Sequence, residues 1–153
     1  MHRTTSATRL AVACALGCVV VSLSAPGCTS APSGPACVSG LTPDCAATYS
    51  PPAFAMIFTG ILQPNCAVGT GTCHTPDFAA GNVVFADQTG AYNVLLGTGG
   101  GTAYVNPGDP GCSTLMKRLE STDPSYHMPR GSNFLSSGDL CTIVQWISQG
   151  AQP

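Results

Sequence analysis

The number and placement of the cysteines constrain the fold of this chain more than any other feature. Nine cysteines occur in 153 residues, of which Cys14 and Cys18 lie in an apolar N-terminal run and Cys28 lies shortly after it. The remaining six are an even number, which is typical of a small domain that folds in an oxidising compartment. Proximity in the sequence suggests disulfides between Cys37 and Cys45 and between Cys112 and Cys141, which leaves Cys66 and Cys73 for another role.

The N-terminus has the pattern of a secretory signal peptide. Arg3 and Arg9 precede an uncharged apolar run over residues 10–23, and small residues follow it over 24–27. The run is shorter than the roughly 18 residues that indicate a membrane-spanning helix. We therefore expect residues 1–27 to be removed on export.

Cys28 would become the first residue of the exported chain. This arrangement resembles a bacterial lipoprotein signal, so we expect either membrane attachment through lipidated Cys28, in the periplasm or at the outer membrane, or plain secretion. Residues 28–52 are rich in Ser, Pro, Gly and Thr and have no helical periodicity, which predicts a flexible tether. Residues 53–153 are then the folded domain.

Composition excludes several classes of function. Charged residues make up 8% of the chain and the formal net charge is -2, so no basic surface is available for nucleic acid. The Gly-rich run over residues 97–111 lacks the Gly-Lys-Ser/Thr ending of a phosphate-binding loop, and no Gly-x-Ser-x-Gly motif is present. These absences leave a hydrolase without support.

Apolar periodicity predicts a mainly α fold, with helices joined by long Gly- and Pro-rich loops. The first helix spans 54–62 and is ended by Pro64, and the last begins at Ser136, pairs it with Asp139 in a capping-box pattern and ends near Gly150. Two short helices are expected between them, one capped by Asp87 and ending at Gly97, the other capped by Ser113 and running through Leu119.

The segment that indicates chemistry is Cys66-Ala67-Val68-Gly69-Thr70-Gly71-Thr72-Cys73-His74. A c-type haem site uses two thiols for thioether bonds and a histidine directly after the second thiol as an iron ligand. The usual spacer is two residues, whereas six separate the thiols here, and Gly69 and Gly71 would let the extra residues bulge outward. The alternative is a Cys66–Cys73 disulfide with His74 as a surface residue.

A second iron ligand is available in the loop Tyr126-His127-Met128-Pro129. We expect Met128 to be the distal ligand, and His127 is the alternative. A zinc site from Cys66, Cys73, His74 and His127 is less favoured, because adjacent Cys and His side chains rarely reach one tetrahedral ion. A copper site is less favoured again, since such sites are typical of β-sandwiches.

In this order of motifs the chain resembles the small monohaem cytochrome c domains of exported bacterial proteins, the planctomycete-type domain and its myxobacterial lipoprotein relatives. The resemblance covers about residues 53–151 and rests on Ile57-Phe58, Cys73-His74, 81–85, 92–96, 105–110, 113–115, Met128-Pro129 and 146–151. It implies a small helical fold whose N- and C-terminal helices pack together.

The resemblance also implies a function. Cys66 and Cys73 would attach one haem c covalently, and His74 and Met128 would be its proximal and distal iron ligands. The protein would be an electron carrier whose partners are other redox proteins. The alternative is a haem-free, disulfide-stapled domain that acts as a binding or structural lipoprotein.

Overall fold

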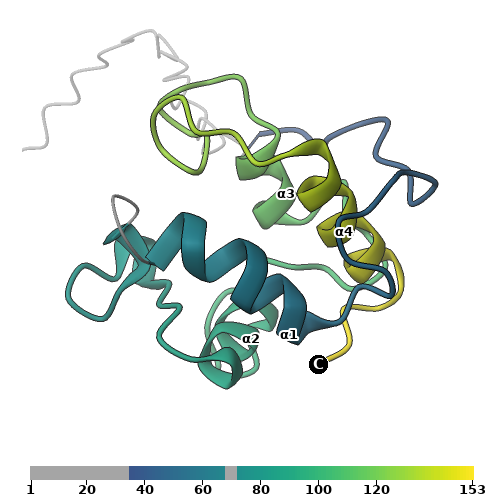
Figure 1. Cartoon of the computed structure of the whole chain (residues 1–153). Coiled ribbons are helices and arrows are strands. Elements are labelled where there is room, and N and C mark those ends of the chain that lie inside the picture. Colours follow the sequence, from purple (N-terminus) through teal and green to yellow (C-terminus); the bar gives the residue numbers. More distant parts are fainter. Residues whose placement is uncertain (1–34, 68–71) are drawn as a thin grey trace, which may run out of the picture. The chain divides into compact units, whose positions relative to one another are not determined.

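Helices and irregular loops make up the part of the chain described by the computed structural model, residues 35–67 and 72–153 (Figure 1). No strand occurs in these residues, so the mainly α prediction is confirmed. The predicted signal peptide, Cys28, Gly69 and Gly71 lie outside them. The helices in chain order are α1 (Phe54–Ile57), η1 (Phe58–Ala67), η2 (Thr72–His74), η3 (Ala80–Asn82), α2 (Gln88–Leu96), α3 (Thr114–Leu119) and α4 (Ser137–Ser148).

The first helix is longer than predicted, because α1 continues without a break into η1 and ends at Ala67. The expectation that Pro64 ends it is wrong. η1 is a π-helix, and its wider turn gives the Pro64 ring room against the preceding turn. The Asn65 side-chain amide donates to the Ile61 carbonyl over 2.7 Å, so this backbone acceptor is satisfied. The longer helix carries Cys66 in its last turn.

The cap signals of α2 and α4 are confirmed. The Asp87 carboxylate accepts from the Gly90 N–H at the start of α2, and Gly97 closes this helix with a φ of 67°. Ser136 accepts from the Asp139 N–H at the start of α4. At its end, the Gly150 and Ala151 N–H groups donate to the Ile147 and Trp146 carbonyls, which is a Schellman motif.

Ser113 precedes α3 as predicted, but its hydroxyl does not cap the helix. The hydroxyl donates instead to the Asp109 carbonyl over 2.8 Å and accepts from the Asn106 N–H over 2.9 Å. Ser113 is fully buried, so these two bonds satisfy its oxygen and fix the loop ahead of α3.

The core forms where α1 packs against α4, as the resemblance implies for the N- and C-terminal helices. Phe54 stacks on Trp146 with ring centroids 5.1 Å apart and meets the edge of Tyr92 of α2 at 5.2 Å. Trp146 donates through Nε1 to the Gln152 carbonyl, and the Tyr92 hydroxyl donates to the Ala151 carbonyl. These contacts join both ends of the domain to α2.

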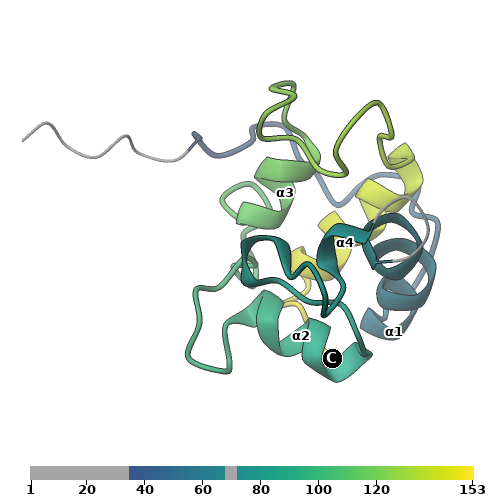
Figure 2. The same cartoon turned by 90° about the vertical axis from the view of Figure 1, so that its left-hand side faces the viewer.

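Residues 37–49, within the predicted tether, are fastened to the domain. Both figures show this segment, in dark blue, running beside α4 before it enters α1 (Figures 1 and 2). Gln145 of α4 donates through Nε2 to the Pro43 and Cys45 carbonyls over 2.9 and 3.0 Å, and the Tyr49 N–H donates to the Thr142 hydroxyl. Residues 37–49 are therefore bound to the domain and are not a flexible linker. We call residues 37–49 the strap.

The disulfides hold the strap, and both predicted pairings are wrong. Cys37 bonds to Cys112 ahead of α3, and Cys45 bonds to Cys141 of α4. Proximity in the sequence misled the prediction, because the strap lies along α4 and brings distant cysteines together. Their Cα atoms are 4.5 and 5.8 Å apart.

Among the helices of the described residues, none is long and apolar enough to cross a bilayer.

Candidate functional site

The two remaining cysteines lie on adjoining helical turns. Cys66 is in the last turn of η1 and Cys73 is in η2, and both are free thiols. The alternative disulfide between them is thus not formed in this structure. Burial raises the pKa of the Cys66 thiol to about 12, and the neighbouring Cys73 contributes in the same direction. Cys66 is therefore a neutral thiol at physiological pH, whereas Cys73 is exposed.

His74 is held on both its backbone and its ring by the segment that precedes α2. The Phe85 N–H donates to the His74 carbonyl over 2.8 Å, and the His74 Nδ1 lies 3.1 Å from the Val83 carbonyl. A carbonyl oxygen only accepts, so Nδ1 carries the proton and donates to it. In the neutral ring Nε2 then carries the lone pair, which is the tautomer that a metal-binding imidazole requires.

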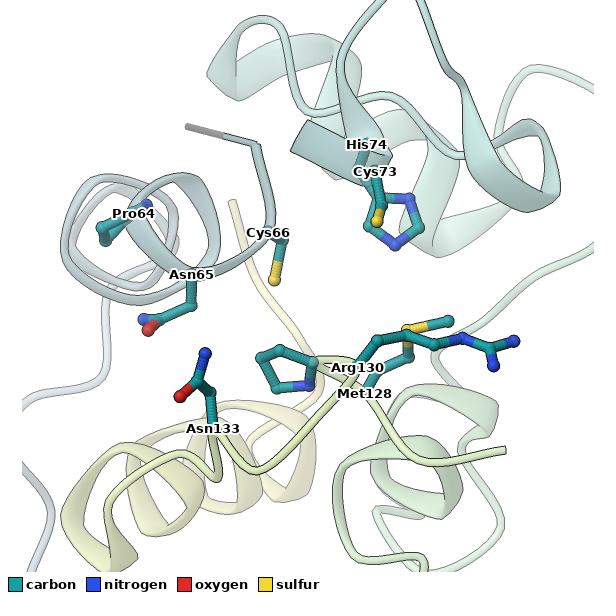
Figure 3. A pocket seen from close by; sticks show the side chains of 9 residues that line it. Pro64, Asn65, Cys66, Cys73, His74, Met128, Arg130 and Asn133 are labelled. Carbon is teal, nitrogen blue, oxygen red and sulfur yellow. The ribbon is translucent and has the colours of Figure 1, made fainter. Parts of the chain in front are cut away.

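Met128 faces His74 across a pocket, as Figure 3 shows. His127, the alternative ligand, does not line this pocket or the larger cavity beside it. Its ring is buried, packs on Phe134 with centroids 4.3 Å apart and donates through Nδ1 to the Pro129 carbonyl. Its Nε2 is the only buried side-chain nitrogen or oxygen of the described residues that has no hydrogen-bond partner.

The pocket of Figure 3 has a volume of about 180 Å³ and adjoins a larger cavity of about 430 Å³. Cys66, Cys73, His74 and Met128 line both of them. The larger cavity has mainly apolar walls, contributed by Leu62, Val83, Phe85, Leu95, Leu115 and Leu119. We call the pocket and the larger cavity together the cleft. The four side chains that the sequence predicts as haem-binding residues therefore converge on one mainly apolar cleft.

The charged residues of the cleft are all cationic. Arg118 of α3 and Arg130 of the following loop line the larger cavity, and no Asp or Glu does. Residues 28–153 contain only one further cation, Lys117. Neither arginine was predicted from the sequence as a site residue. A signal was present in the sequence, because all three basic residues of 28–153 lie between positions 117 and 130.

The alternative zinc site lacks a suitable group of ligand side chains among the described residues. Over residues 35–67 and 72–153, no three or more His, Cys, Asp and Glu side chains are arranged to hold a metal ion. A tetrahedral zinc site is built from side chains of these types. Cys66, Cys73, His74 and His127 are thus not gathered around one point.

The described residues form a small, mainly α domain in which two thiols, an imidazole and a thioether line one cleft, as a cytochrome-type domain requires. Comparison with protein families supports this class, because the family described as Planctomycete cytochrome C matches residues 71–131. The matched segment contains Cys73-His74, α2, α3 and Met128. The match supports, over these residues, the resemblance to the planctomycete-type cytochrome c domain, and Cys66 and α1 lie outside the matched segment. Comparisons with curated proteins and with solved structures found no match.

Proposed function

We propose that this domain is an exported electron carrier that holds one covalently attached haem c. Cys66 and Cys73 would form the thioether bonds, and His74 and Met128 would be the protein ligands of the iron. The observation that carries the proposal is the convergence of these four side chains on one apolar cleft. The family match supports the same conclusion.

The imidazole and the thioether suit the two ligand roles. The Val83 carbonyl fixes the His74 tautomer and ring orientation from outside the site, which is the usual support for a metal-bound histidine. Met128 lies on the opposite side of the pocket (Figure 3). Together they provide one nitrogen and one sulfur ligand from two sides of a single space.

The walls suit a large apolar group with acidic substituents. Haem is a flat apolar macrocycle that carries two carboxylates, and the cleft combines leucine, valine and phenylalanine walls with two guanidinium groups. Arginine pairs with carboxylates through charge-assisted hydrogen bonds. The absence of Asp and Glu from the lining removes the side chains that would repel these substituents.

A bound haem supplies a one-electron iron couple. A methionine and a histidine ligand favour a relatively positive reduction potential. If His74 and Met128 both bound the iron, they would leave no position for a substrate, so we propose a carrier rather than an enzyme. The apolar walls would keep water from the iron.

We further propose that the protein works outside the cytoplasm, in the periplasm or attached to the outer membrane through lipidated Cys28. Its partners would be redox proteins. Residues 28–153 contain seven acidic and three basic side chains, so a basic docking surface on the partner would suit them.

A haem-free domain is the second candidate, and one observation favours it. Two disulfides, each joining residues more than 70 positions apart, hold the domain independently of any cofactor. In that case the protein would be a binding or structural lipoprotein. Cys66 and Cys73 would then pair with each other on oxidation.

The two functions are separated by absorption spectroscopy on protein exported from a host that carries the c-type haem attachment system. We expect a haem spectrum in the wild type, its loss or change to a five-coordinate form in His74→Ala, and retained haem without methionine ligation in Met128→Ala. Met56→Ala is the control, because Met56 is 44% exposed and does not line the cleft. A wild type without haem absorption, or a Met128→Ala spectrum identical to that of Met56→Ala, would overturn the proposal.

A further inference from the structure

The segment that carries Met128 has no regular structure to hold it in place. It lies between α3 and α4, over residues 120–136. The N–H groups of Tyr126 and His127 donate to the Asp123 carbonyl over 2.9 and 2.8 Å. These bonds form a local turn, but they tie the segment only to itself. A contact from a helix is needed to fix the loop against the cleft.

Arg118 of α3 makes that contact in three ways. Its carbonyl accepts the Met128 N–H over 3.0 Å, and its Nη1 donates to the Tyr126 carbonyl over 3.2 Å. Its guanidinium carbon also lies 4.3 Å from the centre of the Tyr126 ring, within the range of a cation–π interaction. One residue of a helix therefore holds the loop at Met128 itself and two positions before it.

Over residues 35–67 and 72–153, the interactions of Arg118 are with the loop, and no acidic side chain pairs with it. Its side chain is partly buried at the edge of the larger cavity. A planar guanidinium can stack on an aromatic ring and donate a hydrogen bond in its own plane, whereas a lysine ammonium cannot do both with the same geometry. The contact with Tyr126 thus depends on arginine specifically.

We infer that Arg118 is a positioning residue for Met128. The Arg118 guanidinium packs on the Tyr126 ring and fixes the loop, so that the Met128 thioether stays on the cleft wall opposite His74. The ligand role of Met128 in this inference rests on the proposed function. The anchoring of the loop by Arg118 does not, and it can be measured in protein without haem.

Two variants test the anchor from its two sides. Arg118→Lys keeps the charge and the backbone carbonyl but loses the planar group. Tyr126→Leu removes the ring and keeps the carbonyl that accepts from Arg118. Lys117→Gln is the matched control, because it removes a charge from the neighbouring position of α3, and Lys117 does not line the cleft.

Hydrogen exchange in the haem-free protein reports on the anchor alone. We expect the amides of residues 126–128 to exchange about tenfold faster in Arg118→Lys and Tyr126→Leu, because local opening of the loop becomes easier, and at the wild-type rate in Lys117→Gln. Unchanged exchange in both test variants would overturn the anchoring.

The haem-loaded protein reports on the ligand. We expect both test variants to weaken the methionine-to-iron charge-transfer absorption and to bind added imidazole about tenfold more tightly, because Met128 competes less well for the iron. Faster exchange with unchanged absorption and imidazole affinity would show that the loop is anchored without positioning Met128, which overturns the inference. A wild type without haem would refute the proposed function and the ligand role together, while exchange would still decide the anchoring.

Discussion

Removal of the Cys45–Cys141 disulfide, which joins the strap to α4, should lower the free energy of unfolding of the domain by several kcal/mol. Cys45 and Cys141 are 96 positions apart, so their bond closes most of the domain into one loop. Because the Cys37–Cys112 bond remains, the shortest closed path runs through it, and it contains 8 positions from Cys37 to Cys45 plus 29 from Cys112 to Cys141, or 37 in all. The loop-closure entropy of the unfolded chain then corresponds to about 3.8 kcal/mol at 25 °C, to which the lost packing of the buried Cys141 sulfur adds about 1 kcal/mol. A bond between Cys37 and Cys45, only eight positions apart, would contribute about 2.5 kcal/mol on the same basis.

The perturbation is Cys45→Ala together with Cys141→Ala, so that no unpaired thiol remains. We expect urea denaturation of the haem-free protein to show a loss of about 4 to 5 kcal/mol in the free energy of unfolding. Cys73→Ala is the control, because Cys73 is an exposed free thiol, and it should change the free energy by less than about 0.5 kcal/mol.

The result that would refute this reasoning is a loss near 1 kcal/mol, which is about the cost of removing the buried Cys141 sulfur from the core alone. A proteolytic digest without reductant checks the pairing independently. It should yield one peptide pair that contains Cys45 and Cys141 and another that contains Cys37 and Cys112.

Two further predictions concern the thiols and the packing of the strap. In haem-free protein Cys66 should react with iodoacetamide far more slowly than Cys73. The pKa of Cys66 is raised from 9.0 to about 12, which lowers its thiolate fraction at pH 8 about a thousandfold, so its reaction rate should rise about tenfold per pH unit up to pH 12. Equal rates for the two thiols at pH 8 would contradict this prediction. Gly60→Ala should destabilise the domain by about 1 to 3 kcal/mol in urea denaturation, because the added Cβ would meet the Tyr49 ring at 2.7 Å from Cζ. Tyr49→Leu should reduce this penalty, and a Gly60→Ala variant as stable as the wild type would show that the strap does not pack there.

Much of the helical structure could be predicted because its signals are local. The Asp87 carboxylate, Gly97 in the left-handed region and the Ser136 hydroxyl each act within a few residues of the helix end that they define. The same reasoning failed at Pro64 and Ser113. Pro64 is accommodated by a π turn, and the Ser113 hydroxyl bonds to a loop that folds back ahead of its helix.

The disulfides and the strap could not be predicted, because they depend on which distant segments pack together. Residues 37–49 have the composition of a linker, yet Gln145 and Thr142 of α4 satisfy their backbone groups. Nothing in the strap alone indicates that α4 would provide these partners. The pairing of its cysteines follows from this packing rather than from their spacing.

The four side chains that line both pockets were selected from the sequence, but the residues that support them were not. Adjacency of Cys73 and His74, and Met128 beside a proline, are visible in the sequence. The Val83 carbonyl that fixes His74 is not, because a backbone group has no residue type to identify it. The role of Arg118 was also hidden, since it requires Tyr126 and Met128 to fold back onto α3.

Covalent haem attachment is the central claim, and the mass of the exported protein tests it most directly. The wild type, made in a host with the c-type attachment system and analysed under denaturing conditions, should be heavier than its processed chain by one haem. That added mass should be absent from the Cys66→Ala, Cys73→Ala double variant. A wild type that carries no haem mass and shows Cys66 and Cys73 as free or mutually disulfide-bonded thiols would contradict the account.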